Sequence, residues 1–205
     1  MKKNRKIIFI LIILIFISCK KTEDDFIFEK LRFENLDKLN LNQLVKSENE
    51  IGSKERKSNN TFGIGSDYYP NSLKYELSNP RVFEINQKEL GLETNYFYSK
   101  KDSLVKVILY QWNTKYLNFK GYENDTLREL KITEKEKYQD KFENLKESLT
   151  EKLGKATEIN IEKRKDTSYN YSDNYRWIKD DLNAYLSLDV SGEDFMEIRL
   201  VVHKK

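Results

Sequence analysis

The stretch "AYLSLDVSGEDFMEIRLVVH", residues 184–203, contains two short runs in which apolar and polar residues alternate. The apolar positions of the two runs are Leu186, Leu188 and Val190, followed by Met196, Ile198, Leu200 and Val202. A period of two is typical of β-strands that bury one face and expose the other. The residues between the runs, "SGED", favour a turn. The stretch therefore predicts a β-hairpin.

Two more strand-like runs lie in the middle of the chain. "TNYFYS" (94–99) and "SLVKVILYQW" (103–112) are separated by "KKD", which predicts a second hairpin. The longer run is apolar at both its odd and its even positions, so it predicts a central strand covered on both faces. "TEINIE" (157–162) and "YRWIK" (175–179) have the residue types of further strands.

The segment "TEKEKYQDKFENLKESLTEKLG", residues 133–154, predicts a helix. Thr133 and Glu136 fit a capping box at its start, and Gly154 fits a left-handed stop at its end. Its apolar stripe consists of Tyr138, Phe142, Leu145, Leu149 and Leu153. Such a stripe must cover a sheet or a partner. The sequence thus predicts the α+β class, with an antiparallel β-sheet packed on one long amphipathic helix at about residues 134–153.

The remaining segments have weaker patterns. Residues 26–45 are apolar without a clean period, so either a short strand and a helix or irregular packing fits. Residues 46–60 contain one apolar residue, Ile51, and predict a long surface loop or a locally disordered segment. A short edge strand is predicted between Pro70 and Pro80, where the alternating residues are Leu73, Tyr75 and Leu77. We expect residues 26–205 to form a single domain.

The first 18 residues are typical of a secretory signal. "MKKNRK" carries four positive charges, and an unbroken apolar run of 11 residues follows from Ile7 to Ile17. A helix needs about 20 apolar residues to span the hydrocarbon core. The short run and the small residue Ser18 favour a signal peptide over residues 1–18 that is cleaved off. An uncleaved signal anchor with an incidental cysteine is the alternative.

The residues Phe16, Ile17, Ser18 and Cys19 resemble the lipobox of bacterial lipoproteins, although the family usually has leucine where Phe16 stands. The resemblance implies that the chain is cut after Ser18 and that the thiol of Cys19 receives a diacylglycerol. Residues 19–25 would then be the lipidated cysteine and a polar tether, "KKTEDD". Lipoproteins retained at the inner membrane typically carry Asp after the cysteine. Lys20 therefore implies the outer membrane, with the domain facing the periplasm or the cell surface.

The charge balance argues against a nucleic-acid partner. Four of the 37 basic residues lie in the predicted signal, which leaves 33 against 34 acidic residues in the mature chain. Nucleic-acid binding needs a net basic face. The segment "SKERK" (53–57) contains an acid, so a solvated loop is the better interpretation.

The residue counts also limit the chemistry. Cys19 is the only cysteine, so a lipidated chain has no disulfide, and one histidine excludes zinc sites built from His and Cys. We expect no metal and no cofactor. His203 falls at a polar position of a terminal strand, which predicts an exposed side chain and not a catalyst. A pair of carboxylates for glycoside hydrolysis stays open.

Aromatic residues cluster with amides and charges in "YQWNTKYLNFKGY" (110–122) and "YNYSDNYRW" (169–177). They suit a sugar ring or a protein partner, or they line the core and the sheet edges. The candidate partner-binding residues are Tyr169, Tyr171, Tyr175, Trp177, Tyr110, Trp112 and Tyr116. The sequence favours a lipid-anchored, non-enzymatic binding or interaction module at the cell envelope, with a protein or glycan partner. The alternatives are an inhibitor or immunity-type protein that neutralises a toxin at the envelope, and a carboxylate-dependent glycan hydrolase.

Overall fold

The computed structural model describes residues 36, 38–57, 64–65, 69, 76–86, 90–113, 125–161, 170–191 and 195–204. Contacts divide the chain into residues 1–32 and residues 33–205, and all the described residues belong to the second unit. The predicted signal peptide, Ser18, Cys19, the tether, Tyr116 and Tyr169 lie outside the described residues.

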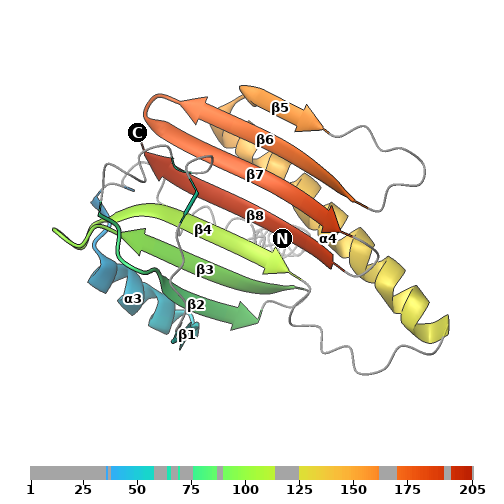
Figure 1. The fold of residues 1–205 in the computed structure, drawn as a ribbon, viewed down its shortest axis with the longest axis horizontal. Helices are drawn as coiled ribbons and strands as arrows, with labels where there is room; N and C mark the ends of the chain where they lie inside the picture. The colour runs from blue at the N-terminus through green and yellow to red at the C-terminus, as the bar shows by residue number, and fades with distance from the viewer. Residues whose placement is uncertain are drawn as a thin grey trace, which may run out of the picture. The chain divides into compact units, whose positions relative to one another are not determined.

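Eight antiparallel strands form one sheet in the order β1-β2-β3-β4-β8-β7-β6-β5 (Figure 1). The strands are β1 (Lys54–Arg56), β2 (Arg81–Asn86), β3 (Gly91–Tyr98), β4 (Val105–Asn113), β5 (Glu158–Ile161), β6 (Tyr171–Lys179), β7 (Leu182–Ser191) and β8 (Phe195–Lys204). Each run of four strands is a meander, and the two meanders join where β4 pairs with β8. The last strand therefore lies in the middle of the sheet.

The predicted α+β class is wrong, because the described chain is a mainly β fold. Helices α3 (Leu41–Glu50) and α4 (Asp125–Leu153) cover the sheet, and pairing between strands makes most of the contacts. Over its full length α4 separates apolar from polar residues only weakly. The stripe seen in the sequence therefore does not extend into a long amphipathic helix around which the fold is organised.

The ends of α4 test the predicted helix signals. The helix begins at Asp125, so Thr133 lies inside it and the predicted capping box is wrong. Gly154 has a φ of +90°, and its N–H donates to the carbonyl of Thr150 (2.9 Å). A left-handed residue after the last turn satisfies a carbonyl that the helix leaves open. The predicted stop at Gly154 is confirmed.

Both helices lie on the same face of the sheet. Tyr96 of β3 and Trp177 of β6 belong to one row of paired residues that runs across β3, β4, β8, β7 and β6. The hydroxyl of Tyr96 donates to Glu48 of α3, and the indole N–H of Trp177 donates to the carbonyl of Gly154 just after α4 (3.1 Å). Residues of one row point to one face. The main core is therefore the layer between this face and the helices.

The opposite face of the sheet is also partly buried. Tyr69, Phe97, Val107 and Val201 form a second apolar cluster there. His203 lies beside it, 4% exposed, with its ring centroid 5.0 Å from that of Tyr69. Burial lowers the pKa of His203 below its usual value, since the charged form loses its hydration. The predictions that β8 has one buried face and that His203 is exposed are both wrong.

The segment predicted as a surface loop, residues 46–60, contains regular structure. Residues 46–50 are the last part of α3, and residues 54–56 are β1. Asn40 caps α3, because its side chain accepts a hydrogen bond from the N–H of Asn42 (2.9 Å). The loop prediction failed because every β1 residue is exposed, so the strand has no apolar alternation to detect.

Candidate functional site

Three of the seven predicted partner-binding residues lie in the core. Tyr110 and Trp112 are 0% exposed and Trp177 is 1% exposed. Tyr110 stacks on Trp112 with ring centroids 6.4 Å apart, beneath the helices. A partner cannot contact these rings in this conformation. Their role is packing, the second interpretation that the sequence left open.

Two other predicted residues, Tyr171 and Tyr175, are half-buried on β6. The ring of Tyr175 stacks on Trp177 (6.0 Å between centroids) and packs against Phe142 of α4 (5.9 Å). The ammonium of Lys146 lies 5.3 Å from the centre of the Tyr175 ring. Tyr175 is thus a contact between sheet and helix and offers only part of its ring to solvent.

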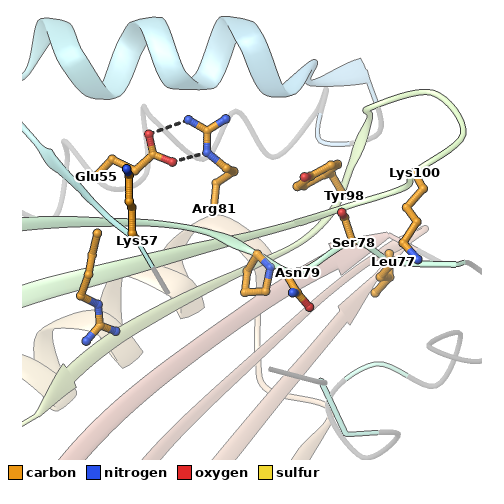
Figure 2. A pocket seen from close by; sticks show the side chains of 10 residues that line it. Glu55, Lys57, Leu77, Ser78, Asn79, Arg81, Tyr98 and Lys100 are labelled. Atoms are coloured by element: carbon orange, nitrogen blue, oxygen red, sulfur yellow. Dashed lines mark hydrogen bonds and ion pairs between the residues drawn. The ribbon is translucent and has the colours of Figure 1, made fainter. Parts of the chain in front are cut away.

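An open pocket of about 650 Å³ lies where β1 ends, β2 begins and β3 ends (Figure 2). We call it the basic pocket, because four of its residues carry a positive charge and one carries a negative charge. It is lined by Glu55, Arg56, Lys57, Leu77, Ser78, Asn79, Pro80, Arg81, Tyr98 and Lys100. None of these residues was a candidate in the sequence.

Irregular strand ends form the wall of the basic pocket. The pairing of β3 with β4 shifts its register between Phe97 and Tyr98, which re-aims the end of β3. Residues 77 and 78 then run alongside this end, where the N–H of Ser78 donates to the carbonyl of Tyr98 (2.8 Å). Pro80 is buried just before β2 begins, and it has no N–H to pair with a neighbouring strand. A hollow is left between the strand ends.

A forked ion pair lies in the basic pocket. The guanidinium of Arg81 donates two hydrogen bonds to the carboxylate of Glu55, one of them from Nη2 to Oε2 at 2.6 Å (Figure 2). Glu55 raises the pKa of Arg81 above its usual value, chiefly through these bonds. The side chains of Arg81 and Glu55 are 33% and 38% exposed, so water screens the pair.

The other cations of the basic pocket differ in their partners. Arg56 pairs with Glu84 (3.0 Å) and Glu93 (2.6 Å) on the neighbouring strands. The Nζ of Lys100 lies 2.6 Å from Oε1 of Glu76, and this ammonium lowers the pKa of the Glu76 carboxyl. Lys57 is exposed, and it makes no ion pair with any other described residue.

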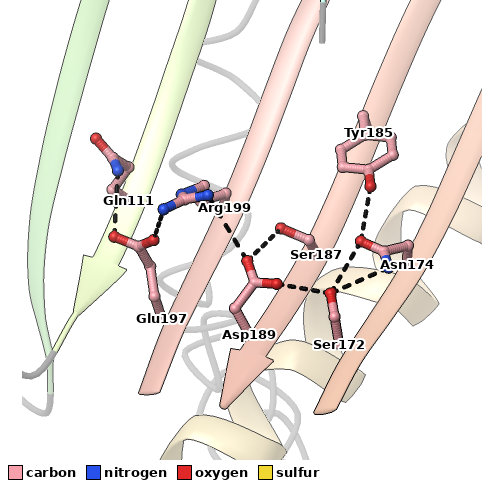
Figure 3. Close-up of polar contacts among 8 residues, drawn as sticks. All are labelled: Gln111, Ser172, Asn174, Tyr185, Ser187, Asp189, Glu197 and Arg199. Carbon is pink, nitrogen blue, oxygen red and sulfur yellow. Dashed lines mark hydrogen bonds and ion pairs between the residues drawn. The ribbon is translucent and has the colours of Figure 1, made fainter. Parts of the chain in front are cut away.

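A second polar cluster crosses four strands on the face away from the helices (Figure 3). Arg199 pairs with Glu197 and lies 3.8 Å from Asp189, which accepts from Ser172 (2.6 Å) and Ser187 (3.3 Å). The cluster comprises Gln111, Ser172, Asn174, Tyr185, Ser187, Asp189, Glu197 and Arg199. Because these groups bind one another, they link β4, β8, β7 and β6 on this face. The basic pocket is the better candidate site.

Sequence reasoning missed the basic pocket because its residues are scattered over three segments. One signal was available: "RVFEIN" (81–86) contains Val82, Phe83 and Ile85, residue types that favour a strand, and it in fact forms β2. Together with the predicted β3, this strand would have placed Arg81 at a sheet edge. The charged segment "SKERK" contributes Glu55, Arg56 and Lys57.

No helix among the described residues has both the length and the apolar character that crossing a membrane requires. Within the same part of the chain, no three side chains of His, Cys, Asp or Glu cluster closely enough to hold a metal ion. No known protein family, curated protein or solved structure matches this chain.

Proposed function

We propose that this protein is a lipid-anchored binding module of the bacterial cell envelope, which contacts its partner through the basic pocket. The observation that carries the proposal is the pocket itself: it is open, its lining has four cationic side chains against one carboxylate, and Lys57 makes no ion pair with any other described residue. Clefts with one sign of charge attract ligands of the opposite sign. The expected partner group is therefore an anion. A toxin neutralised at the envelope is one protein partner of this kind.

The pocket fits binding better than glycoside hydrolysis. That reaction needs two carboxyl groups flanking the bond that is cut. The pocket contains one carboxylate, Glu55, and Arg81 holds both of its oxygens. The lining therefore does not supply the pair of carboxyl groups that this reaction needs.

The anchoring part of the proposal rests on the resemblance of residues 16–19 to a lipobox. One acyl chain gives weak, reversible membrane binding, whereas two or more hold a protein stably. A diacylglycerol on Cys19 would supply two chains. The polar residues that follow would leave the sheet free to meet its partner near the membrane surface.

Photo-crosslinking in intact cells tests the binding surface. We expect a photo-reactive residue in place of Asn79, which is exposed at the pocket, to give adducts of discrete size with the partner. The same residue in place of Glu151, which is exposed on α4, should give none. Immunoblots and mass spectrometry measure the adducts. Equal patterns from both positions, or no adduct from position 79, would contradict the proposal.

Mass spectrometry of the mature N-terminus tests the anchoring. We expect the chain to begin at an acylated Cys19 and to sediment with membranes, whereas Cys19→Ser should leave an unacylated chain with its signal uncleaved. Thr22→Ala changes the tether and keeps the cysteine, so it should behave as wild type. A full-length chain with an unmodified thiol would refute the anchoring. The crosslinking result would still stand, because it tests the binding surface alone.

A further inference from the structure

We propose that the basic pocket binds a carboxylate side chain of an extended acidic protein segment, and that this carboxylate displaces Glu55 from Arg81. The inference rests on the proposed function and names the ligand class of the same pocket. Glu55 then acts as an intramolecular competitor, whose carboxylate binds the guanidinium of Arg81 until the partner binds.

The geometry of Arg81 points to a planar anion. Its Nε and Nη2 both donate to Glu55, one to each carboxylate oxygen. Two parallel hydrogen bonds of this kind are the arrangement by which arginine recognises a carboxylate. The ring of Phe83 lies beneath the guanidinium, with 5.9 Å from Cζ to its centre, and keeps the fork in place. The guanidinium of Arg81 is thus preformed for a carboxylate, and the carboxylate of Glu55 already occupies it.

The Glu55 carboxylate can exchange at low cost. Both partners of the ion pair are about one-third exposed, so water screens the pair, and a partner carboxylate can replace the two hydrogen bonds with two of the same kind. Glu55 belongs to the edge strand β1, whose three residues are all exposed. A partner carboxylate also gains the exposed ammonium of Lys57, which directly follows the end of β1. Glu55 and Lys57 both line the pocket, two positions apart in the chain.

The position of β1 favours an extended protein segment over other sources of a carboxylate. β1 is the first strand of the sheet order, and its outer edge pairs with no strand among the described residues. A peptide can add to such an edge through main-chain hydrogen bonds and place every second side chain on one face. Acidic residues at that spacing would lie near Lys57. Arg81 is on the next strand, β2, so one glutamate side chain would reach across β1 to take the place of Glu55. Leu77 and Pro80 supply apolar contact for the methylene groups.

Fluorescence anisotropy with the full-length protein in detergent tests this inference. The probe is a short labelled peptide with glutamate at every second position, and the control peptide has glutamine there. We expect Glu55→Gln to tighten binding about two- to fivefold, because the internal competitor is removed. Lys57→Gln should weaken binding by a similar factor, and higher salt should weaken it further.

Two matched variants control for net charge. Glu50→Gln removes a negative charge from α3, and Lys155→Gln removes a positive charge just after α4, and neither residue lines the pocket. Both should leave binding unchanged. All four variants should unfold at the same urea concentration as wild type, which separates binding from folding.

The possible outcomes are distinct. If Lys57→Gln weakens binding and Glu55→Gln does not tighten it, the pocket binds acids without displacing Glu55, and the inference is overturned while the proposed function stands. If the peptide does not bind, or if all variants bind alike, the inference is overturned, and crosslinking from position 79 decides on the proposed function separately. If a trimer of galacturonate shows the expected pattern and the peptide does not, the ligand is an acidic glycan and the inference is again overturned.

Discussion

Replacing Trp112 by alanine should lower the free energy of unfolding by about 3–5 kcal/mol. The indole is fully buried, stacks on Tyr110, and lies under the ammonium of Lys141 from α4, 5.4 Å from the ring centre. Its removal leaves a cavity between the sheet and the helix that the rigid strands on both sides cannot close. Urea denaturation followed by circular dichroism measures the loss.

The matched control for Trp112→Ala is Ile159→Ala on β5. Ile159 is 59% exposed, so we expect its truncation to change stability by less than about 0.5 kcal/mol. The comparison separates a role of Trp112 in core packing from a role in partner binding. If Trp112→Ala kept wild-type stability and lost the crosslinked partner, Trp112 would be a contact residue and its placement in the core would be wrong.

Tyr96→Phe should destabilise the protein by about 1–3 kcal/mol, whereas Tyr110→Phe should be neutral or stabilise it by up to about 1 kcal/mol. The Tyr96 hydroxyl donates to the carboxylate of Glu48, which is 0% exposed on α3. Without this donor, a buried oxygen loses a partner. The hydroxyl of Tyr110 is also buried, but it has no hydrogen-bond partner among the described residues. Tyr110→Phe therefore removes a buried hydroxyl whose desolvation no hydrogen bond in the described part of the chain compensates.

The two tyrosines are a well-matched pair because they share their surroundings. Both are 0% exposed, and burial raises the pKa of each phenol well above its usual value. Both substitutions delete one oxygen from one ring. Unfolding in urea at neutral pH, where both phenols are protonated, measures the difference. An equal loss in both variants would show that the bond to Glu48 is not what fixes α3 to the sheet.

The strands were predictable where their signal is local. The apolar alternation in β7 and β8 and the two-sided apolar run of β4 are each visible within ten residues of sequence. The class of the fold was not predictable in this way, because it depends on how the strands pair. Gln111 and Glu197 bond across the central pair while 86 positions apart in the chain, and no periodicity reports such a contact.

The site was harder to predict than the fold. Tyr and Trp are frequent both in cores and at interfaces, so the composition of residues 110–122 could not separate the two. The burial of Trp112 depends on residues distant in sequence, such as Lys141 of α4, whose ammonium lies over its ring. The basic pocket was hard to predict for a different reason. Its positive charge comes from three segments that meet at a corner of the sheet. In the sequence, each segment lies next to or contains acidic residues, so none of them shows an excess of positive charge by itself.

The central place of β8 sets the order in which the chain can fold. During synthesis, β1 to β4 and β5 to β7 emerge before the strand that joins them. Until then β4 and β7, both largely apolar, are open edges that can pair with other chains. Contacts between distant residues also form slowly. The nascent protein therefore passes through a period in which two half-sheets are prone to aggregate, and loss of its last ten residues would make that state permanent.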